Sequence, residues 1–354
     1  MSSSKSNRKL FTVCIPFKNE GDEVGKTCKS VRDTAGNMVD IVVLNDCSDD
    51  GYDYKSDLDQ YNVRYYESDH RLGSCMGKET CIQKVKTPYF LVLDAHCRIY
   101  TENWLELATE LMQRRESKNT VYCCACQYFN NDIDHQSPTH MKAFGGYWDY
   151  NIKTIFSCGW NLSNFTVDDD CEPFDVPCIL GANYISTKSW WDKIGGYQGL
   201  QLYGREETFI SLKSQMAGGK VKCFPKICTG HKTRPNNIQP YNCFCYEIAH
   251  NEMVIAYICT PHLFDKLMEV WESIYGYDIS IYDIAKQLFY SHIDELNILK
   301  DKFESIKKKS QQDVDKFNRQ FQKKIGYSYR RLKKANLGTY AKFKSGEKIG
   351  FPLG

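Results

Sequence analysis

A short apolar run ends in two residues whose side chains could hold a metal ion. Residues 90–93 are all apolar and are followed by Asp94 and, two positions further, His96. The run predicts a buried β-strand, and alternate residues of an extended segment point to the same side, so both side chains would enter one crevice. A carboxylate oxygen and an imidazole nitrogen together suit a divalent cation such as Mn²⁺ or Mg²⁺. The alternative is a strand end capped by the aspartate, with a hydrogen-bonded core histidine.

The elements expected to position this pair follow a regular order. Residues 11–17, 41–44 and 63–66 predict three more strands, and the first two run directly into polar loops. Helices are expected after the first strand, to about Thr34, and from residue 70 to about Lys84. Strands that alternate with helices and end in polar residues predict a parallel α/β sheet with its ligand at the carboxyl edge.

The order of these motifs resembles the polypeptide N-acetylgalactosaminyltransferases, which are glycosyltransferases of the GT-A fold. The resemblance spans roughly residues 10–260 and consists of KNE at 18–20, NDCSD at 45–49, RLGS at 71–74, LDAHCRIYTENWLE at 93–106, CGWNL at 158–162, ILGANYIS at 179–186, YGREE at 203–207 and CTGHK at 228–232. It implies an α/β protein of the GT-A fold, with a mostly parallel central sheet flanked by helices and a C-terminal helical extension. It also implies a transferase that uses a UDP-sugar as donor.

By this resemblance, Asp94, His96 and His231 bind a manganese ion that bridges the diphosphate of the donor. Gly230 would allow the backbone to approach a phosphate closely, because it has no Cβ. A structural or surface role remains the alternative for His231.

The resemblance also implies donor contacts along the carboxyl edge of the sheet. Asp46 would bind the uracil or ribose, or else cap its acidic turn, and Arg71 would reach the base or diphosphate, or else form a surface salt bridge. Asn183 would bond sugar hydroxyls, or else serve a turn. The complete set of predicted donor contacts is Pro16, Asn19, Glu20, Asp46, Arg71, Gly181, Ala182, Asn183 and Arg234.

Two acidic residues, Glu206 and Glu207, are the predicted catalytic groups. They open a predicted helix, where the helix dipole alone favours acids; the functional interpretation places them beside the transferring sugar, where a carboxylate stabilises oxocarbenium-like charge. Arg205, Glu207 and Tyr203 depart from the family, which has glycine, asparagine and tryptophan there. The resemblance implies a retaining reaction, whereas an inverting enzyme would use one of these carboxylates as general base.

The composition of the 354 residues is that of a soluble globular protein. The chain has a net charge of +2 and contains 17 cysteines. No apolar run reaches membrane-spanning length, and the N-terminus lacks a signal peptide, so a cytoplasmic protein is expected, with a virus-encoded enzyme in a host cytoplasm as one form of it. Cysteines in that compartment are expected to be buried and reduced, with a metal at Cys123 and Cys126 as the alternative.

We expect a disordered N-terminus over residues 1–9, a GT-A domain over 10–260 and a helical extension over 261–354. From Lys300 to Lys348 there are 16 Lys and Arg against 5 Asp and Glu, and such a basic tail suits a polyanion. The leading predicted acceptor is therefore 5-hydroxymethylpyrimidine in DNA, and the alternative is a protein serine, threonine or hydroxyproline. A catalytically silent nucleotide-sugar-binding module is the alternative of another class.

Overall fold

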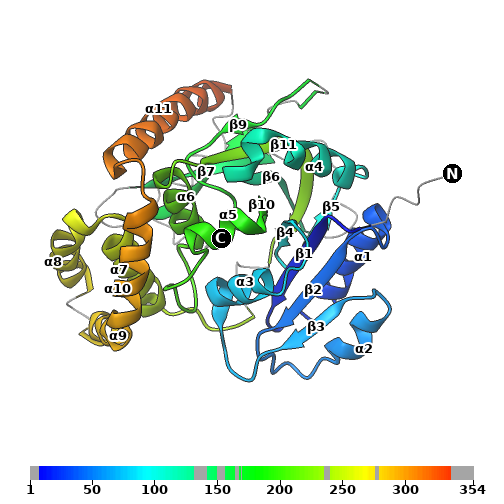
Figure 1. Ribbon diagram of the computed structural model, residues 1–354, viewed down its shortest axis with the longest axis horizontal. Coiled ribbons are helices and arrows are strands. Elements are labelled where there is room, and N and C mark those ends of the chain that lie inside the picture. The colour runs from blue at the N-terminus through cyan, green and yellow to red at the C-terminus, as the bar shows by residue number, and fades with distance from the viewer. Residues whose placement is uncertain are drawn as a thin grey trace.

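The computed structural model describes residues 8–130, 142–149, 156–163, 167–168, 170–234, 240–275 and 279–335 (Figure 1). Its first half is a parallel sheet in the order β3-β2-β1-β4, formed by β1 (Phe11–Phe17), β2 (Asp40–Asn45), β3 (Arg64–Glu67) and β4 (Tyr89–Leu93). The connecting helices are α1 (Glu23–Ala35), α2 (Tyr54–Asp59) and α3 (Gly73–Gln83). The predicted alternation of strands and helices is confirmed here.

The sheet continues beyond β4 through an antiparallel strand. β10 (Asn183–Thr187) pairs with β4 and with β6 (Thr120–Phe129), and β11 (Lys220–Lys232) runs parallel to β6. β5 (Cys97–Ile99) pairs with the end of β11. This last pairing matters for the site, because it brings His231 opposite Cys97, next to His96.

Shorter elements complete this half of the molecule. The hairpin β7 (Lys142–Asp149) and β8 (Ser157–Ser163) extends from β6, and β9 (Phe174–Asp175) pairs with β11. The remaining helices of this half are α4 (Trp104–Gln113), α5 (Lys188–Ile194), α6 (Glu206–Met216) and α7 (Cys245–Cys259).

The strand sequences explain why the sheet is covered on both faces. In β1, Val13 and Ile15 pack with α1, while Cys14, which points to the opposite face, packs with residues of α3. A strand buried on both faces needs apolar residues at consecutive positions, and FTVCIPF provides them. The predicted α/β sheet flanked by helices is therefore confirmed.

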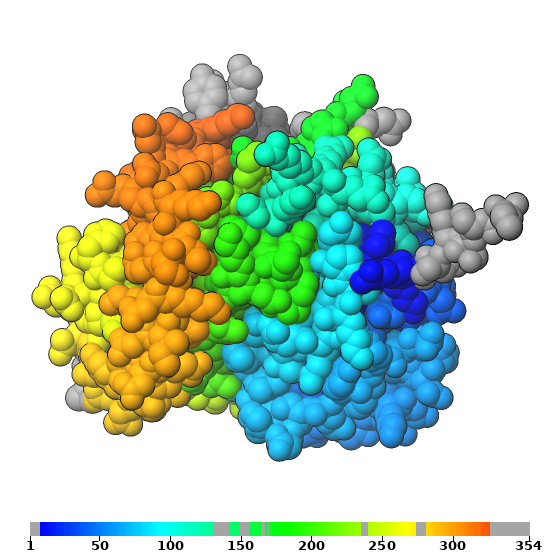
Figure 2. All heavy atoms as spheres, viewed as in Figure 1, coloured from blue at the N-terminus to red at the C-terminus, as the bar shows by residue number. Residues whose placement is uncertain are grey.

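Among the described residues, the α-helices after residue 260 are α8 (Phe264–Tyr275), α9 (Ile279–Ser291), α10 (Ile293–Ile306) and α11 (Gln311–Ala335). A break at His292 separates α9 from α10. α8, α9 and α10 pack on α7, while α11 packs on α6 and β7. Figure 2 shows these helices, yellow to orange, in direct contact with the green body of the molecule.

The extension shares one hydrophobic core with the sheet, since Trp271, Phe289 and Leu296 belong to the same buried cluster as Phe90. The domain boundary at residue 260 stays a prediction. All 17 cysteines are free thiols, and most are buried, as expected. Within the described residues, no helix has the length and apolar character that a membrane span requires.

Candidate active site

One pocket collects most of the predicted site residues at the carboxyl ends of the strands. Its empty space, counted out into the open solvent, is about 820 Å³. The residues that line it come from segments far apart in the sequence. They include Pro16, Glu20, Asp46, Arg71, Lys78, Asp94, His96, Trp160, Gly181, Ala182, Glu206, Glu207 and His231.

Asp94, His96 and His231 form a group whose ligand atoms all lie within 4.8 Å of one another. Nε2 of His231 lies 3.2 Å from Nε2 of His96 and 3.4 Å from Oδ2 of Asp94. One carboxylate oxygen and two imidazole nitrogens that converge at this spacing fit a borderline divalent cation such as Mn²⁺. The fold therefore brings together the three metal ligands that were predicted from the sequence.

Electrostatics keep this group ready to bind a cation. Burial lowers the pKa of His231, so its imidazole is neutral at physiological pH. Burial opposes ionisation of Asp94, but Lys78 and His231 outweigh it and hold the pKa of that carboxyl well below its usual range. Nδ1 of His231 has no hydrogen-bond partner among the described residues, and its ring instead packs edge-on against Tyr128 and Trp160.

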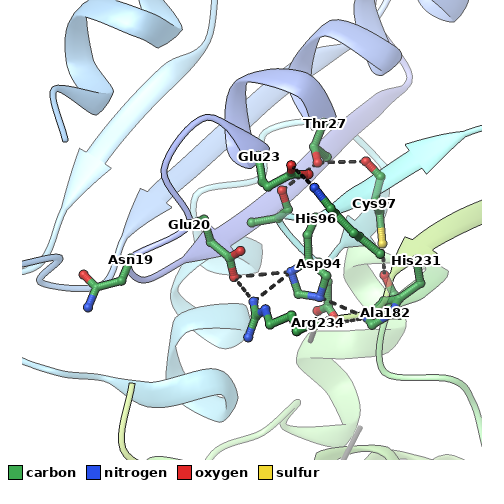
Figure 3. Close-up of polar contacts among 12 residues, drawn as sticks. Asn19, Glu20, Glu23, Thr27, Asp94, His96, Cys97, Ala182, His231 and Arg234 are labelled. Atoms are coloured by element: carbon green, nitrogen blue, oxygen red, sulfur yellow. Dashed lines mark hydrogen bonds and ion pairs between the residues drawn. The ribbon is translucent and has the colours of Figure 1, made fainter. Parts of the chain in front are cut away.

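Glu20 and Arg234 contact the outer side of His96 (Figure 3). Nδ1 of His96 lies 3.3 Å from Oε1 of Glu20 and 3.1 Å from Nη2 of Arg234, and Arg234 also pairs with Glu20. A carboxylate on the outer nitrogen of a metal-binding histidine fixes the tautomer and makes the inner nitrogen a better ligand. Both residues were predicted to contact the donor, and their position indicates that they orient a metal ligand.

The turn that carries His96 is held by α1. Oγ1 of Thr27 lies 2.6 and 2.8 Å from the carbonyl oxygens of Ala95 and Cys97. Glu23, one turn earlier, binds Lys232 at 2.6 Å and Arg98 at 2.7 Å. Although burial opposes it, these two cations lower the pKa of Glu23 to about 2. The ends of β4 and β11 are thus tied to the same helix.

Lys78 is a site residue that sequence reasoning missed. It is 4% exposed, and its Nζ lies 3.5 Å from Oδ1 of Asp94 and 3.2 Å from Oε1 of Glu206. Burial lowers the pKa of this ammonium, but Asp94 and Glu206 hold it well above its usual range. Helical spacing was the available signal, since Lys78 lies between the apolar residues Cys75 and Ile82 on one face of α3.

The two predicted catalytic acids are both buried, but their surroundings differ. Oε1 of Glu206 accepts from Ser74 Oγ at 2.6 Å and from Lys78, which compensates a negative charge. Glu207 has no such cation at hydrogen-bond distance, and burial together with repulsion from Glu206 raises its pKa to about 8. At neutral pH, Glu207 is therefore a neutral acid.

Gly181 and Gly230, two glycines that were predicted to lie near the donor, leave space for protein side chains. A Cβ on Gly181 would lie 2.4 Å from Oε1 of Glu207, and one on Gly230 would lie 2.1 Å from the hydroxyl oxygen of Tyr100. Real Cβ contacts are never that short, so a larger residue would displace these neighbours. The expectation that Gly230 serves approach to a phosphate is corrected: it accommodates Tyr100.

Asp46 and Arg71 line the pocket, but internal partners already occupy them. The carboxylate of Asp46 accepts from the backbone N–H groups of Leu72 and Gly73 at 2.5 and 2.8 Å. Arg71 forms a two-point ion pair with Glu247 of α7, at 2.7 and 3.1 Å. Their predicted contacts with the nucleotide stay predictions, since each would have to bind it in addition to these partners.

Asn19 and Asn183 do not line the pocket. Asn19 points away from the metal-ligand group (Figure 3) and bonds Asp49 and the carbonyl of Pro240. Asn183 is fully buried inside the sheet, where its side chain bonds Thr229 and the backbone N–H of Cys124. The predicted contacts of these two residues with the donor stay predictions, and strand geometry turns Asn183 into the core.

Aromatic side chains form part of the pocket wall. Trp160 is stacked on Tyr128, with ring centroids 5.3 Å apart, and Tyr203 lies beside Tyr241. Trp148, Trp190 and Trp191, by contrast, are buried in the core. Trp160 is therefore the one that remains a candidate for contact with a substrate.

The described residues thus form a mixed sheet with a group of candidate metal ligands and two acids at its carboxyl edge. Residues 12–183, just under half of the chain, match the family described as Glycosyl transferase family 2. The chain is 25% identical over 229 residues to rat Polypeptide N-acetylgalactosaminyltransferase 10, covering 62% of this chain and 37% of that one. It is 26% identical over 250 residues to human Polypeptide N-acetylgalactosaminyltransferase 16, covering 68% and 43%.

A solved structure agrees in fold. The crystal structure of GalNAc-T7 with UDP, GalNAc and Mn²⁺ superposes with a TM-score of 0.58 and 21% identity, over 81% of this chain and 55% of that one. The chain spans less than half of the length of the two curated relatives named above. The predicted fold and the predicted enzyme class are both confirmed at this level.

Proposed function

We propose that this protein is a metal-dependent glycosyltransferase that moves an N-acetylhexosamine from a UDP-sugar to a hydroxyl group of a macromolecule. The observation that carries the proposal is the convergence of Asp94, His96 and His231 within 4.8 Å, in the pocket that also holds Glu206. The names of the relatives and the ligands of the GalNAc-T7 structure support the sugar and the nucleotide.

The divalent cation would be held by Asp94, His96 and His231. When bound, it supplies positive charge that neutralises the diphosphate as the sugar departs. The other contributions come from side chains of the protein. Lys78 contributes a fixed buried cation next to Asp94, and Glu20 orients His96. Glu206 lies where a carboxylate can stabilise positive charge on the sugar ring.

Retention of configuration is the outcome that the acids favour. An inverting enzyme needs an unprotonated carboxylate free to accept the proton of the acceptor hydroxyl. Glu206 is engaged by Lys78 and Ser74, and Glu207 carries a proton at neutral pH. With neither acid suited to be that base, the departing phosphate is the better proton acceptor. Proton NMR of the anomeric centre in the first-formed product tests this.

The acceptor we propose is a polypeptide hydroxyl. The relatives are named for polypeptide acceptors, whereas the argument for DNA depended on a basic tail. The side chains of residues 326–354 lie outside the described residues, and α11 before them carries Asp313 and Asp315 as well as basic residues. A DNA acceptor has no support beyond the charge count, and it becomes an outcome of the test.

The test is incubation with UDP-GalNAc, UDP-GlcNAc or UDP-glucose, with Mn²⁺ or EDTA, in the presence of a threonine-rich peptide or hydroxymethylcytosine DNA. We expect metal-dependent UDP release and a mass gain of one acetylhexosamine on the peptide. A mass gain on the DNA nucleoside alone would reverse the acceptor. Absence of UDP release with every donor and acceptor, while UDP still binds, would favour the silent module. Asp94→Asn serves as the inactive control.

A further inference from the structure

The loop that leads into Glu206 has an unusual backbone. Leu202, Gly204 and Arg205 have φ angles of 52°, 99° and 72°, all in the left-handed region. Such conformations are disfavoured for residues with a Cβ and persist only where surrounding contacts impose them. Arg205 directly precedes α6, so its conformation sets where Glu206 begins the helix. Contacts with the rest of the protein must therefore stabilise this loop conformation.

Helix α7 provides one set of contacts through Asn251. This side chain is fully buried, and its amide nitrogen lies 2.8, 3.2 and 2.9 Å from the carbonyl oxygens of Gln201, Tyr203 and Gly204. Its oxygen accepts from the backbone N–H of Gln201 at 2.9 Å. The backbone of the loop is therefore fixed to α7.

The next residue of α7 holds the side chain of the loop. Oε1 of Glu252 lies 2.8 Å from Nε and 2.7 Å from Nη2 of Arg205. Its other oxygen accepts from the indole N–H of Trp271 at 2.8 Å. The Trp271 ring is 1% exposed, so this bond is shielded from water. A charge-assisted bond of this kind is stronger than a neutral one.

Trp271 belongs to α8, the first long helix of the extension. The chain of contacts thus runs from the extension, through Glu252, to Arg205, and ends at the residue next to Glu206. We propose that the helical extension is part of the catalytic apparatus, and that Trp271, Glu252 and Arg205 are positioning residues that hold Glu206 in place. This inference rests on the proposed transfer reaction.

The positioning contacts are separate from the metal ligands. Asp94 and His96 follow β4, and His231 lies in β11, where sheet pairing and α1 hold them. Weakening the link to the extension should therefore leave metal and donor binding nearly intact. It should lower the rate of the chemical step, which depends on the placement of Glu206.

The first variant is Trp271→Phe, which keeps a ring but removes the N–H donor. We expect kcat to fall about tenfold or more, KM for the UDP-sugar to stay within about twofold, and Mn²⁺ affinity to be unchanged. The backbone amides of residues 201–206 should exchange hydrogen faster. The matched control is Trp191→Phe, which removes an indole bond of 2.9 Å to another buried glutamate, Glu79. Equal kcat and equal loop exchange in the two variants would overturn the proposal.

A second variant separates positioning from stability. Arg205→Gly alone leaves Glu252 buried without its cation. The double variant, Arg205→Gly with Glu252→Gln, removes the negative charge as well. Glycine suits the φ of 72° at position 205. We expect the double variant to recover the melting temperature of the wild type but not its kcat. Recovery of both together would show that the link serves stability alone. Should the wild type transfer no sugar, the exchange of residues 201–206 in Trp271→Phe still decides whether the extension holds the loop.

Discussion

Lys78 and Asp94 form a buried ion pair of 3.5 Å, in which a fixed ammonium group contacts a candidate metal ligand. The same ammonium contacts Glu206, so one cation compensates both the metal-binding and the catalytic carboxylates. Without a metal, Lys78 is the cation closest to these acids among the described residues. The stability of the site should consequently depend on Lys78 and on metal together.

Lys78→Met removes this cation. We expect the unfolding free energy in EDTA to drop by about 3 kcal/mol, because breaking a buried pair leaves uncompensated carboxylates. Mn²⁺ should stabilise the variant more than it stabilises the wild type, since the metal supplies charge that the variant lacks. Urea unfolding with EDTA or Mn²⁺ measures both. Lys84→Met, at the exposed end of the same helix, is the control; matching stabilities for the two variants would refute a role for the pair.

The metal ligands and their outer partner should differ in effect. Asp94→Asn and His231→Ala should abolish Mn²⁺ binding in titration calorimetry. Glu20→Gln, which alters only the residue behind His96, should weaken it by about 10- to 100-fold. His262→Ala changes an exposed histidine and should bind Mn²⁺ like the wild type. Tight binding by Asp94→Asn or His231→Ala would contradict the assigned ligand set.

Glu207→Gln tests the assignment of the neutral acid. The pKa of Glu207 is raised to about 8 from an ordinary 4.5, so the folded state binds more protons than the unfolded state between these values. Stability should thus fall as pH rises through that window, and glutamine should remove the loss. We expect Glu207→Gln to melt higher than the wild type at pH 8, but not at pH 4.5. It should also retain most activity, whereas Glu206→Gln should lose about 100-fold or more.

A histidine pair joins α7 to the extension and should make stability depend on pH. Nε2 of His250 and His292 lie 2.9 Å apart, and Nδ1 of His250 lies 2.9 Å from Oδ1 of Asn251. That oxygen can only accept, so His250 carries its hydrogen on Nδ1 and receives one from His292. Glu295 is the nearest acid, at 3.9 Å from His292.

Burial lowers the pKa of His250 to about 4 from an ordinary 6.5. The unfolded chain therefore binds more protons between these values, and stability should fall as the pH is lowered. From pH 7 to pH 5 we expect the wild type to lose about 2 kcal/mol of stability relative to His250→Gln, because all other titrating groups, Glu207 included, are common to both proteins. Urea unfolding at the two pH values measures the difference, and His262→Gln is the control. An identical loss in His250→Gln would place the titration elsewhere.

Sequence patterns closely predicted the strands and helices from β1 to β4. The expected strand 11–17 matches β1, and the expected helix to about Lys84 matches α3, which ends at Gln83. These signals are local, since an apolar run and the polar residues after it lie within one element. The second half was less predictable, because the antiparallel insertion of β10 between β4 and β6 depends on pairing between distant segments.

The sequence by itself predicted the candidate metal ligands, the two acids and the fold class, because the residue types and their order carry that information. Only the tertiary structure decided what each side chain contacts. Arg71 pairs with Glu247, which lies 176 residues further along the chain. Asp46 accepts a hydrogen bond from the start of α3, and Gly230 leaves space for Tyr100. Lys78 becomes a site residue for the same reason: contacts of a few ångströms between distant segments exist only once the chain has folded.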